Sequence, residues 1–396
     1  MAGSATMPSW SDLPGDLLRE ISGHICDAAD YVRCQAVCKH WRDAVSPPPA
    51  MFFFPWIVGP CIYQPWPGRA DNDELLFRSV SLNATFRVPR DSCLGETCSV
   101  RATDGAGGRV LAVGSWHGVS LVNPLTGDTT LLPWGFPDHI ARCLGDLHGA
   151  VTGDGTVLLY TGYRDGTYDA AIHRPGGGDE AWTSVANAEI DHITRCQWGP
   201  WRHCATYHDG KVFQAGSTFS LVEMLTIAPG DKFAEKPEWR SLPRVGPQSS
   251  GYGYFFDLAG EMMWAYVDAA PPLVVKISVY SLEKDQSGGE RWVKRDDAPR
   301  LLSSSVLFLG GTSSFAVEAA QLAGHHAGGE VYLMIDTIGR SLGYLKMCRV
   351  YRYRWEDDTV AMVDEANRWI SPQYCNWFVP RPTLHVASHP PLHQSS

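Results

Sequence analysis

The sequence has no apolar run long enough to cross a bilayer and no excess of positive charge. No window approaches the roughly 18 apolar residues of a membrane-spanning helix, and the apolar stretch 51–58 is far too short. The formal charge of −10 argues against non-specific nucleic-acid binding, which needs a basic face. The N-terminus lacks the basic start and apolar run of a signal peptide. We therefore expect a cytoplasmic and/or nuclear protein without membrane or nucleic-acid partners.

Two sequence signatures of common enzymes are missing. The sequence has no phosphate-binding loop ending in Gly-Lys and no His-Glu-x-x-His metal motif. Solvated turns explain acidic pairs such as Asp296-Asp297, and a loop tip explains His325-His326 better than a metal site does. We therefore predict no catalytic residues, no cofactor and no bound metal, so that the protein is not an enzyme.

The cysteines show no repeated paired spacing. Their number, 11, is odd, and in a reducing compartment such residues are mostly small buried hydrophobic side chains. Cys26, Cys34, Cys38 and His40 could in principle gather around zinc. However, Cys34 and Cys38 are four residues apart on a predicted helix, and no Cys-x-x-Cys pair accompanies them, so we do not predict a zinc site.

What the sequence does have is a strongly patterned N-terminus. An apolar stripe at helical spacing predicts a short first helix. The stripe consists of Leu17, Leu18, Ile21 and Ile25. A second helix should follow from about Asp30, with Asp27 or Asp30 as its N-cap. Its expected apolar face consists of Val32, Ala36, Val37 and Trp41. Helices this short cannot bury their own apolar faces, so part of that surface must pack on the rest of the chain or on a partner.

These N-terminal residues resemble an F-box. The pattern of that family is Leu-Pro, then Asp-Leu-Leu and a spaced Ile, and later Val-Cys-Lys-x-Trp-Arg. This sequence has Leu13-Pro14, 16–18, Ile21 and 37–42 in that order, with the expected spacing. The resemblance implies docking on the Skp adaptor of a cullin–RING ubiquitin ligase. The adaptor-binding residues that it implies are Leu13, Pro14, Leu17, Ile21, Val37 and Trp41. The alternative is an ordinary helical cap whose leucines belong to the core.

The pattern changes after the proline-rich stretch 47–50. Short runs rich in Val, Phe, Tyr, Trp and Thr now alternate with turn residues. Asp-Gly pairs, which favour tight hairpins, occur at 104–105, 154–155, 165–166 and 209–210. Candidate strands lie at 110–115, 119–123, 156–161, 205–208, 212–215, 262–267, 274–282, 305–309, 315–318 and 331–335. Few intervening stretches suit a crossover helix, which favours an antiparallel all-β arrangement.

The β region contains more short strands than one ordinary β-sandwich does. Radial repetition removes the exposed sheet edges, and it predicts a β-propeller of six or seven blades at roughly 40–50 residues per blade. Seven motifs in order resemble the plant F-box-associated domain known as domain of unknown function 295, over about residues 50–380. They are 118–127 with 131–133, 207–213, 254–264, 277–282, 307–311 with 314–317, 331–336 and 377–380. The aromatic run 52–54 departs from the family pattern.

The two resemblances together imply a mainly β protein with four parts. A helical F-box is expected at 1–46, a proline-rich linker at 47–50, a six- or seven-bladed β-propeller at 51–382 and a disordered tail at 383–396. The implied function is that of a substrate-recognition subunit of an SCF-type (Skp–cullin–F-box) E3 ubiquitin ligase, in which propeller loops bind an unknown protein target. The alternatives are a ligase-independent scaffold and a small-ligand-binding or enzymatic propeller.

Two short aromatic runs, 51–58 and 377–379, begin and end the β region. Neither has a hairpin partner adjacent in the sequence, and prolines stop further pairing after the second. We therefore expect the two runs to lie in the same or neighbouring blades and to close the ring. The alternative is that Trp377 and Phe378 only cap a ring that is closed elsewhere.

Overall fold

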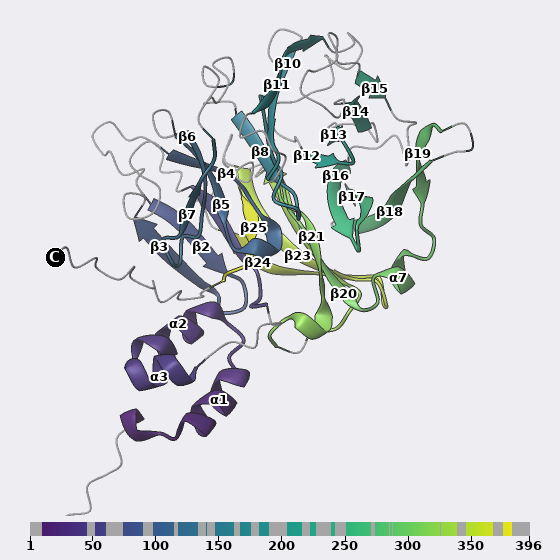
Figure 1. Ribbon diagram of the computed structural model, residues 1–396. Helices are drawn as coiled ribbons and strands as arrows, with labels where there is room; N and C mark the ends of the chain where they lie inside the picture. Colours follow the sequence, from purple (N-terminus) through teal and green to yellow (C-terminus); the bar gives the residue numbers. More distant parts are fainter. Residues whose placement is uncertain are drawn as a thin grey trace, which may run out of the picture.

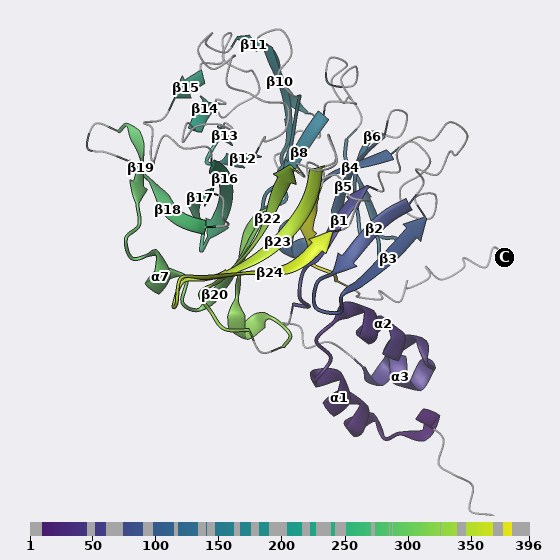
Figure 2. The same cartoon turned by 180° about the vertical axis from the view of Figure 1, so that it is seen from behind.

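A computed structural model shows a small helical module beside a ring of β-sheets (Figures 1 and 2). It describes residues 10–45, 52–60, 74–89, 98–114, 118–133, 140, 147–161, 167–175, 182–189, 204–215, 222–226, 239–241, 251–270, 274–284, 286, 288–324, 326–338, 346–366 and 375–381. The expected linker and tail lie outside these residues. Within the described part of the chain, no helix is both long and apolar enough to span a membrane.

The helical module contains a single 3-10 turn and three short helices. They are η1 (Trp10–Asp12), α1 (Gly15–Gly23), α2 (Ala28–Ala36) and α3 (Lys39–Ala44). Leu18 of the predicted stripe is fully buried. The predicted N-cap is confirmed at Asp27, whose carboxylate accepts a hydrogen bond from the Ala29 N–H at 2.8 Å.

The second predicted helix is in fact two helices, because the chain is interrupted before Lys39. Cys38 is extended, and its thiol accepts a hydrogen bond from the Trp41 N–H at 3.5 Å, so that α3 starts anew. The predicted apolar face does not point into the core, because Val32 and Val37 are exposed whereas Tyr31, which lies outside that face, is buried. A polar residue, Gln35, is buried with it.

The buried hydroxyl of Tyr31 on α2 has hydrogen-bond partners inside the module, whereas the side-chain oxygen of Gln35 has none. The Tyr31 hydroxyl donates to the Val45 carbonyl at 3.1 Å and accepts from the Gln35 amide at 2.7 Å. A buried hydroxyl needs such partners, and burial raises the pKa of Tyr31 to about 12. Sequence periodicity that counts only apolar residues misses this face of α2.

The described strands form six sheets, which we give in spatial order. The first contains β25 (Asn376–Phe378), β1 (Trp56–Pro60), β2 (Glu74–Ser79) and β3 (Ala84–Pro89). The second contains β4 (Cys98–Thr103), β5 (Val110–Gly114), β6 (Gly118–Val122) and β7 (Thr129–Leu131). The third contains β11 (Thr183–Glu189), β10 (Thr167–His173), β9 (Val157–Thr161) and β8 (Leu147–Val151).

The other three sheets complete the ring. The fourth contains β12 (Cys204–His208), β13 (Lys211–Ala215), β14 (Val222–Thr226) and β15 (Trp239–Ser241). The fifth contains β16 (Gly251–Leu258), β17 (Glu261–Ala270), β18 (Val274–Lys284) and β19 (Glu290–Lys294). The sixth contains β21 (Phe315–Glu318), β20 (Ser305–Leu309), β22 (Glu330–Ile338), β23 (Lys346–Arg354) and β24 (Thr359–Ala366). Short helical turns η2 (Gly105–Gly107), α7 (Ala298–Leu301) and η4 (Ala319–Gln321) lie between strands.

The inner strands of successive sheets contact one another around the ring. The order is β25, β4, β8, β12, β16 and β21. The predicted β-propeller architecture is therefore confirmed, and each of the ten candidate strands corresponds to a strand of the structure. The described strand pairs are antiparallel, as expected, with one exception, because β20 pairs with β22 in parallel. The hairpin strand β21 and the turn η4 come between them in the chain and let β22 start at the same end as β20.

The predicted closure of the ring is confirmed by the pairing of β1 with β25. Trp56 lies opposite Phe378 and Ile57 opposite Trp377 in an antiparallel register. Trp377 is fully buried, and its indole N–H donates to the carbonyl of Leu309 in the sixth sheet at 3.0 Å. The last described strand thus joins the first sheet to the sixth.

The helical module and the ring share one hydrophobic core. Leu18 and Tyr31 of the helices belong to the same buried cluster as Trp56, Phe77 and other residues of the first two sheets. The centroids of the Tyr31 and Phe53 rings lie 5.3 Å apart. The two parts are therefore packed together, and removing either one exposes apolar surface on the other.

A buried carboxylate, that of Asp27, holds this junction. Besides capping α2, it accepts hydrogen bonds from the indole N–H of Trp56 at 3.3 Å and from the hydroxyls of Ser79 and Ser81 at 2.7 and 2.9 Å. Only 3% of Asp27 is exposed. One side chain therefore fixes the start of a helix against β1 and the turn after β2.

We predict that the C-terminal strand is essential for stability. Ending the chain before Trp377 removes three fully buried side chains, Trp377, Phe378 and Val379. This should cost more than about 5 kcal/mol, comparable with the whole stability of many domains. Ending it after Arg381 should leave the melting temperature nearly unchanged. Equal melting temperatures for the two truncated proteins would show that the ring closes elsewhere.

We also predict that Asp27→Ala destabilises the protein by about 2–4 kcal/mol. The change removes a helix cap and leaves buried donors on Trp56 and Ser79 without an acceptor. Chemical denaturation of the full chain measures the effect. Asp30→Ala is the control, because Asp30 is part of an exposed pair with Arg33, and it should cost less than about 1 kcal/mol.

Candidate functional site

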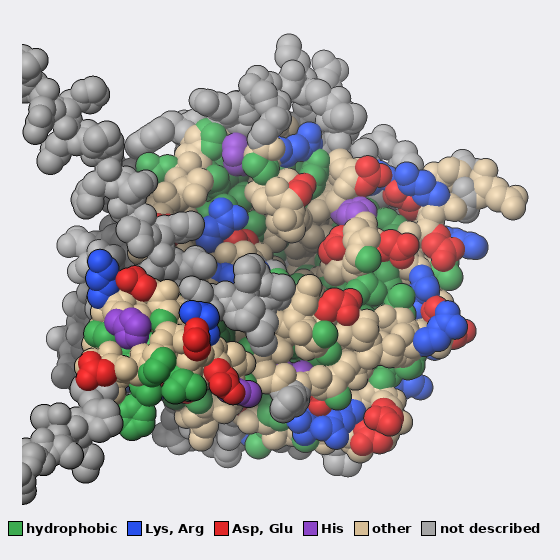
Figure 3. All heavy atoms as spheres, turned by 60° about the horizontal axis from the view of Figure 1, so that its bottom comes forward, with side chains coloured by type: hydrophobic (Ala, Val, Ile, Leu, Met, Phe, Trp, Pro, Cys, Tyr) green, Lys and Arg blue, Asp and Glu red, His purple; other side chains and the backbone are tan. Residues whose placement is uncertain are grey.

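Exposed apolar side chains concentrate on the helical module. Among the described residues, the large hydrophobic side chains that are exposed are Trp10, Leu17, Ile21, Val32, Val37, Leu82, Leu131 and Met362. The first five belong to the helical module, which is a small fraction of the chain. Figure 3 shows hydrophobic side chains gathered on this module, next to charged groups. We call the exposed side chains of Leu17, Ile21 and Val37 the docking face.

The structure divides the six predicted adaptor-binding residues into two groups. Leu17 and Ile21 lie one turn apart on α1 and are 46% and 43% exposed, and Val37 is 52% exposed. Pro14 is exposed as well. Leu13 and Trp41 are half-buried and pack against the shared core.

The two half-buried residues hold the module together. The indole N–H of Trp41 donates to the Trp10 carbonyl at 3.0 Å, and a ring nitrogen of His40 lies 2.8 Å from the Leu13 carbonyl. These bonds tie the segment before α1 to α3. The sequence pattern did not name Trp10 as a contact residue, although it is 75% exposed and lies three residues before Leu13.

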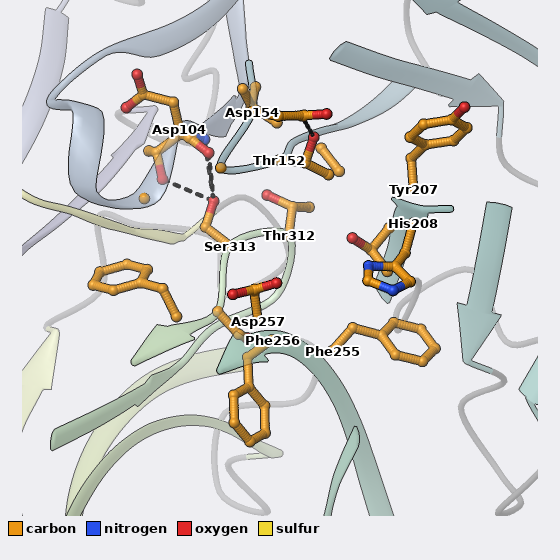
Figure 4. A pocket seen from close by; sticks show the side chains of 18 of the residues that line it. Asp104, Thr152, Asp154, Tyr207, His208, Phe255, Phe256, Asp257, Thr312 and Ser313 are labelled. Carbon is orange, nitrogen blue, oxygen red and sulfur yellow. Dashed lines mark hydrogen bonds between the residues drawn. The ribbon is translucent and has the colours of Figure 1, made fainter. Parts of the chain in front are cut away.

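A cavity of about 750 Å³ lies at the centre of the ring. Its walls come from the ends of β4, β8, β12 and β16 and from the segment that leads into β21 (Figure 4). Side chains that line it include Asp104, Asp154, Tyr207, His208, Asp257 and Thr312. The Asp-Gly pairs at 104, 154 and 209 were predicted only as turns, and the ring brings their carboxylates around one opening. Gly105, Gly155 and Gly210 all have positive φ, which glycine adopts readily.

Closure of the ring also builds one wall of the cavity. The hydroxyl of Thr103 donates to the Trp377 carbonyl at 2.5 Å. The hydroxyl of Ser313 donates to the Thr103 carbonyl and accepts the Thr103 N–H, each at 3.1 Å. Since Thr103 and Ser313 are buried, these bonds fix the loop before β21 against β4 and β25.

The cavity is acidic, and its carboxylates are in different environments. Burial raises the pKa of Asp104, and hydrogen bonds from Arg109, whose Nε lies 2.7 Å away, act in the opposite direction. Partial burial also raises the pKa of Asp154, but hydrogen bonds from Thr152 and Thr156 outweigh it and hold that pKa below its ordinary value. Asp154 is therefore ionised at neutral pH.

The buried thiol in the cavity wall is not poised for nucleophilic chemistry. Burial raises the pKa of Cys204 to about 11, which leaves the thiol protonated at neutral pH. Among the described residues, no group of three His, Cys, Asp or Glu side chains is placed to hold a metal ion. The arrangement is suited to binding rather than to covalent catalysis by cysteine.

Two family models match the chain. One is described as the KIB1-4 β-propeller and matches residues 77–353, which is well over half of the chain. The chain belongs to the KIB1-4 β-propeller family. The other is described as F-box-like and matches residues 10–50, which include the helical module with its docking face. This KIB1-4 family protein thus combines an F-box-like module with a β-propeller.

The chain is similar to known proteins over parts of different length. An F-box protein of Arabidopsis thaliana, At2g26160, is 39% identical over 41 residues, which are 10% of this chain and 12% of that protein. A putative 6-phosphogluconolactonase from Bacteroides uniformis is 14% identical, with 81% of this chain and 84% of that chain covered and a TM-score of 0.36. An α-L-arabinanase from Cellvibrio cellulosa, complexed with arabinohexaose, is 11% identical, with 67% and 92% covered and a TM-score of 0.27. Structural likenesses this distant do not bear on function.

We predict that alkylation of the folded protein discriminates between two cysteines. Cys26 is exposed, whereas Cys204 is buried and its raised pKa lowers the thiolate fraction by about 100-fold relative to an ordinary thiol. Brief treatment with iodoacetamide near pH 8, followed by peptide mapping, should label Cys26 well before Cys204. Equal labelling would show that the cavity wall opens in solution.

Proposed function

We propose that this protein is the substrate-recognition subunit of an SCF-type E3 ubiquitin ligase and is not itself an enzyme. The helical module docks on a Skp adaptor, and through it on the cullin and RING subunits. The propeller binds the protein that is to be ubiquitinated. The observation that supports this proposal best is the docking face, which lies on a module matched by an F-box-like family model.

Exposed apolar side chains are costly in water unless a partner covers them. Exposed apolar side chains that gather on one small part of a protein are typical of interaction sites, whereas scattered ones are not. Leu17 and Ile21 project from a helix whose other side is anchored in the core by Leu18, so the docking face is available without any rearrangement. A fixed apolar face on short helices suits an adaptor that buries it on assembly.

The junction at Asp27 adds a mechanism to the proposal. Because that carboxylate bonds to both the helical module and the ring, the docking face keeps a fixed position relative to the propeller. Rigid linkage of two binding surfaces raises the effective concentration of a bound target beside the ligase subunits. We place this activity in the cytoplasm and/or nucleus.

Replacing Leu17 and Ile21 together by Ala should reduce adaptor binding by at least about tenfold. Anchor residues carry most of the energy of an interface, and both side chains are exposed, so the fold should be retained. Co-purification of a Skp-type protein with the full chain measures the effect. Trp41→Ala is a poorer test, because it also disrupts the packing of the module itself.

Met362→Ala is the matched control, since Met362 is 55% exposed but lies on β24, far along the chain from the module. Adaptor binding should survive this change. Undiminished adaptor binding by the Leu17 and Ile21 double variant would refute the docking face. Adaptor recovery without any ubiquitinated target would favour a ligase-independent scaffold, and turnover of a small molecule by the full chain would favour an enzyme.

A further inference from the structure

We infer that the central cavity binds a basic segment of the target and receives a Lys or Arg side chain between Asp154 and Asp257. This inference rests on the proposed function only where it calls the ligand a target. The binding chemistry follows from the cavity alone. Its size, about 750 Å³, is within the range of roughly 300–1,000 Å³ that ligand sites occupy, so it accommodates several side chains of a peptide.

Two of the four aspartates that line the cavity are already neutralised by the protein itself. Asp104 pairs with Arg109, whose Nε lies 2.7 Å from the carboxylate. Asp209 lies 3.7 Å from the Nζ of Lys284 in an exposed ion pair. These two carboxylates therefore give little reason to expect an external cation.

The other two aspartates, Asp154 and Asp257, have hydrogen bonds but no cation among the described residues. Asp154 accepts hydrogen bonds from Thr152 and Thr156, and Asp257 accepts one from the Gly260 N–H at 2.9 Å. Both come from the inner ends of sheets, and Figure 4 shows them at the central opening. Local bonds thus hold two solvent-exposed carboxylates in place without an ion pair among the described residues.

The same walls already accommodate guanidinium groups of this chain. The guanidinium of Arg109 donates a hydrogen bond to the carboxylate of Asp104. The guanidinium of Arg174 lies 5.2 Å from the centroid of the Tyr207 ring. Carboxylates and aromatic faces are the two kinds of group that bind Arg and Lys side chains. A ligand cation at Asp154 and Asp257 would repeat chemistry that the rim uses internally.

Charge also decides against other occupants. An acidic or phosphorylated segment would meet unpaired carboxylates, which costs binding energy. A neutral glycan would leave both charges uncompensated. The net charge of −10 favours the approach of a basic partner from a distance.

The test uses the intact full-length protein and a fluorescent 12-residue peptide of alternating Lys, Arg, Ser and Gly. A second peptide has Gln in place of every Lys and Arg. Fluorescence anisotropy at about 150 mM salt, where diffuse surface attraction is screened, measures both affinities. The basic peptide should bind at least about tenfold more tightly than the neutral one. Asp154→Asn with Asp257→Asn should weaken binding of the basic peptide by about tenfold.

Asn keeps the size of the side chain and one oxygen that still accepts the Thr156 and Gly260 N–H groups, so both turns should be retained. The matched control is Asp357→Asn with Asp296→Asn, which removes the same charge elsewhere. Asp357 has the same kind of local hydrogen bonds as Asp154. It accepts them from the N–H and hydroxyl of Thr359, which follows two residues later in the chain. Asp296 is exposed and only loosely paired with Lys294. The control protein should bind the basic peptide within about twofold of the original.

Three results would overturn the inference. They are no binding of the basic peptide, equal binding by the Asp154 and Asp257 double variant, or equally tight binding of the neutral peptide or of a neutral hexasaccharide. Adaptor co-purification is measured on the same proteins. Loss of the adaptor with retained peptide binding would refute the proposed function alone, whereas adaptor binding without peptide binding would refute the cavity alone.

Discussion

The pairing of β1 with β25 is the constraint on which the rest of the structure depends. It joins residues from the two ends of the described β region, and it buries Trp377 between the first and sixth sheets. The carbonyl of Trp377 accepts a hydrogen bond from the Thr103 hydroxyl. The carbonyl of Thr103 in turn accepts one from the hydroxyl of Ser313, which lies in the loop before β21. The cavity wall therefore exists only when the ring is closed. A defect in closure would remove the cavity along with the stability.

The helical module depends on the same closed ring through Trp56. This residue pairs with Phe378 across the closure and donates its indole N–H to Asp27 at the junction. A single side chain thus links the ring closure to the cap of α2. The docking face and the cavity are consequently fixed relative to each other.

Local sequence patterns predicted the elements but not every boundary. Asp27 was predicted as an N-cap because a short acidic side chain before a helical run can accept a hydrogen bond from a backbone N–H of the first turn. Its bond from the Ala29 N–H confirms the prediction. Alternation and turn pairs located the strands, since a strand and its hairpin are specified within a few residues. The break at Cys38 was missed, because the thiol that caps α3 has no recognised capping preference. The parallel pair of β20 with β22 was missed because strand order is decided by contacts distant in the sequence.

The sequence by itself determined the helical module, the apolar stripe of α1, the strand-rich composition of the rest and the pairing of its aromatic ends. These follow from periodicity and apolar content, which act over short distances along the chain. Only the tertiary structure decided that Asp104, Asp154 and Asp257 surround one cavity, and that Asp27 bonds to Ser79 and Trp56. Each of those aspartates looks like an ordinary turn or cap residue in the sequence. The closed ring places the three cavity aspartates around one opening, although they lie far apart along the chain.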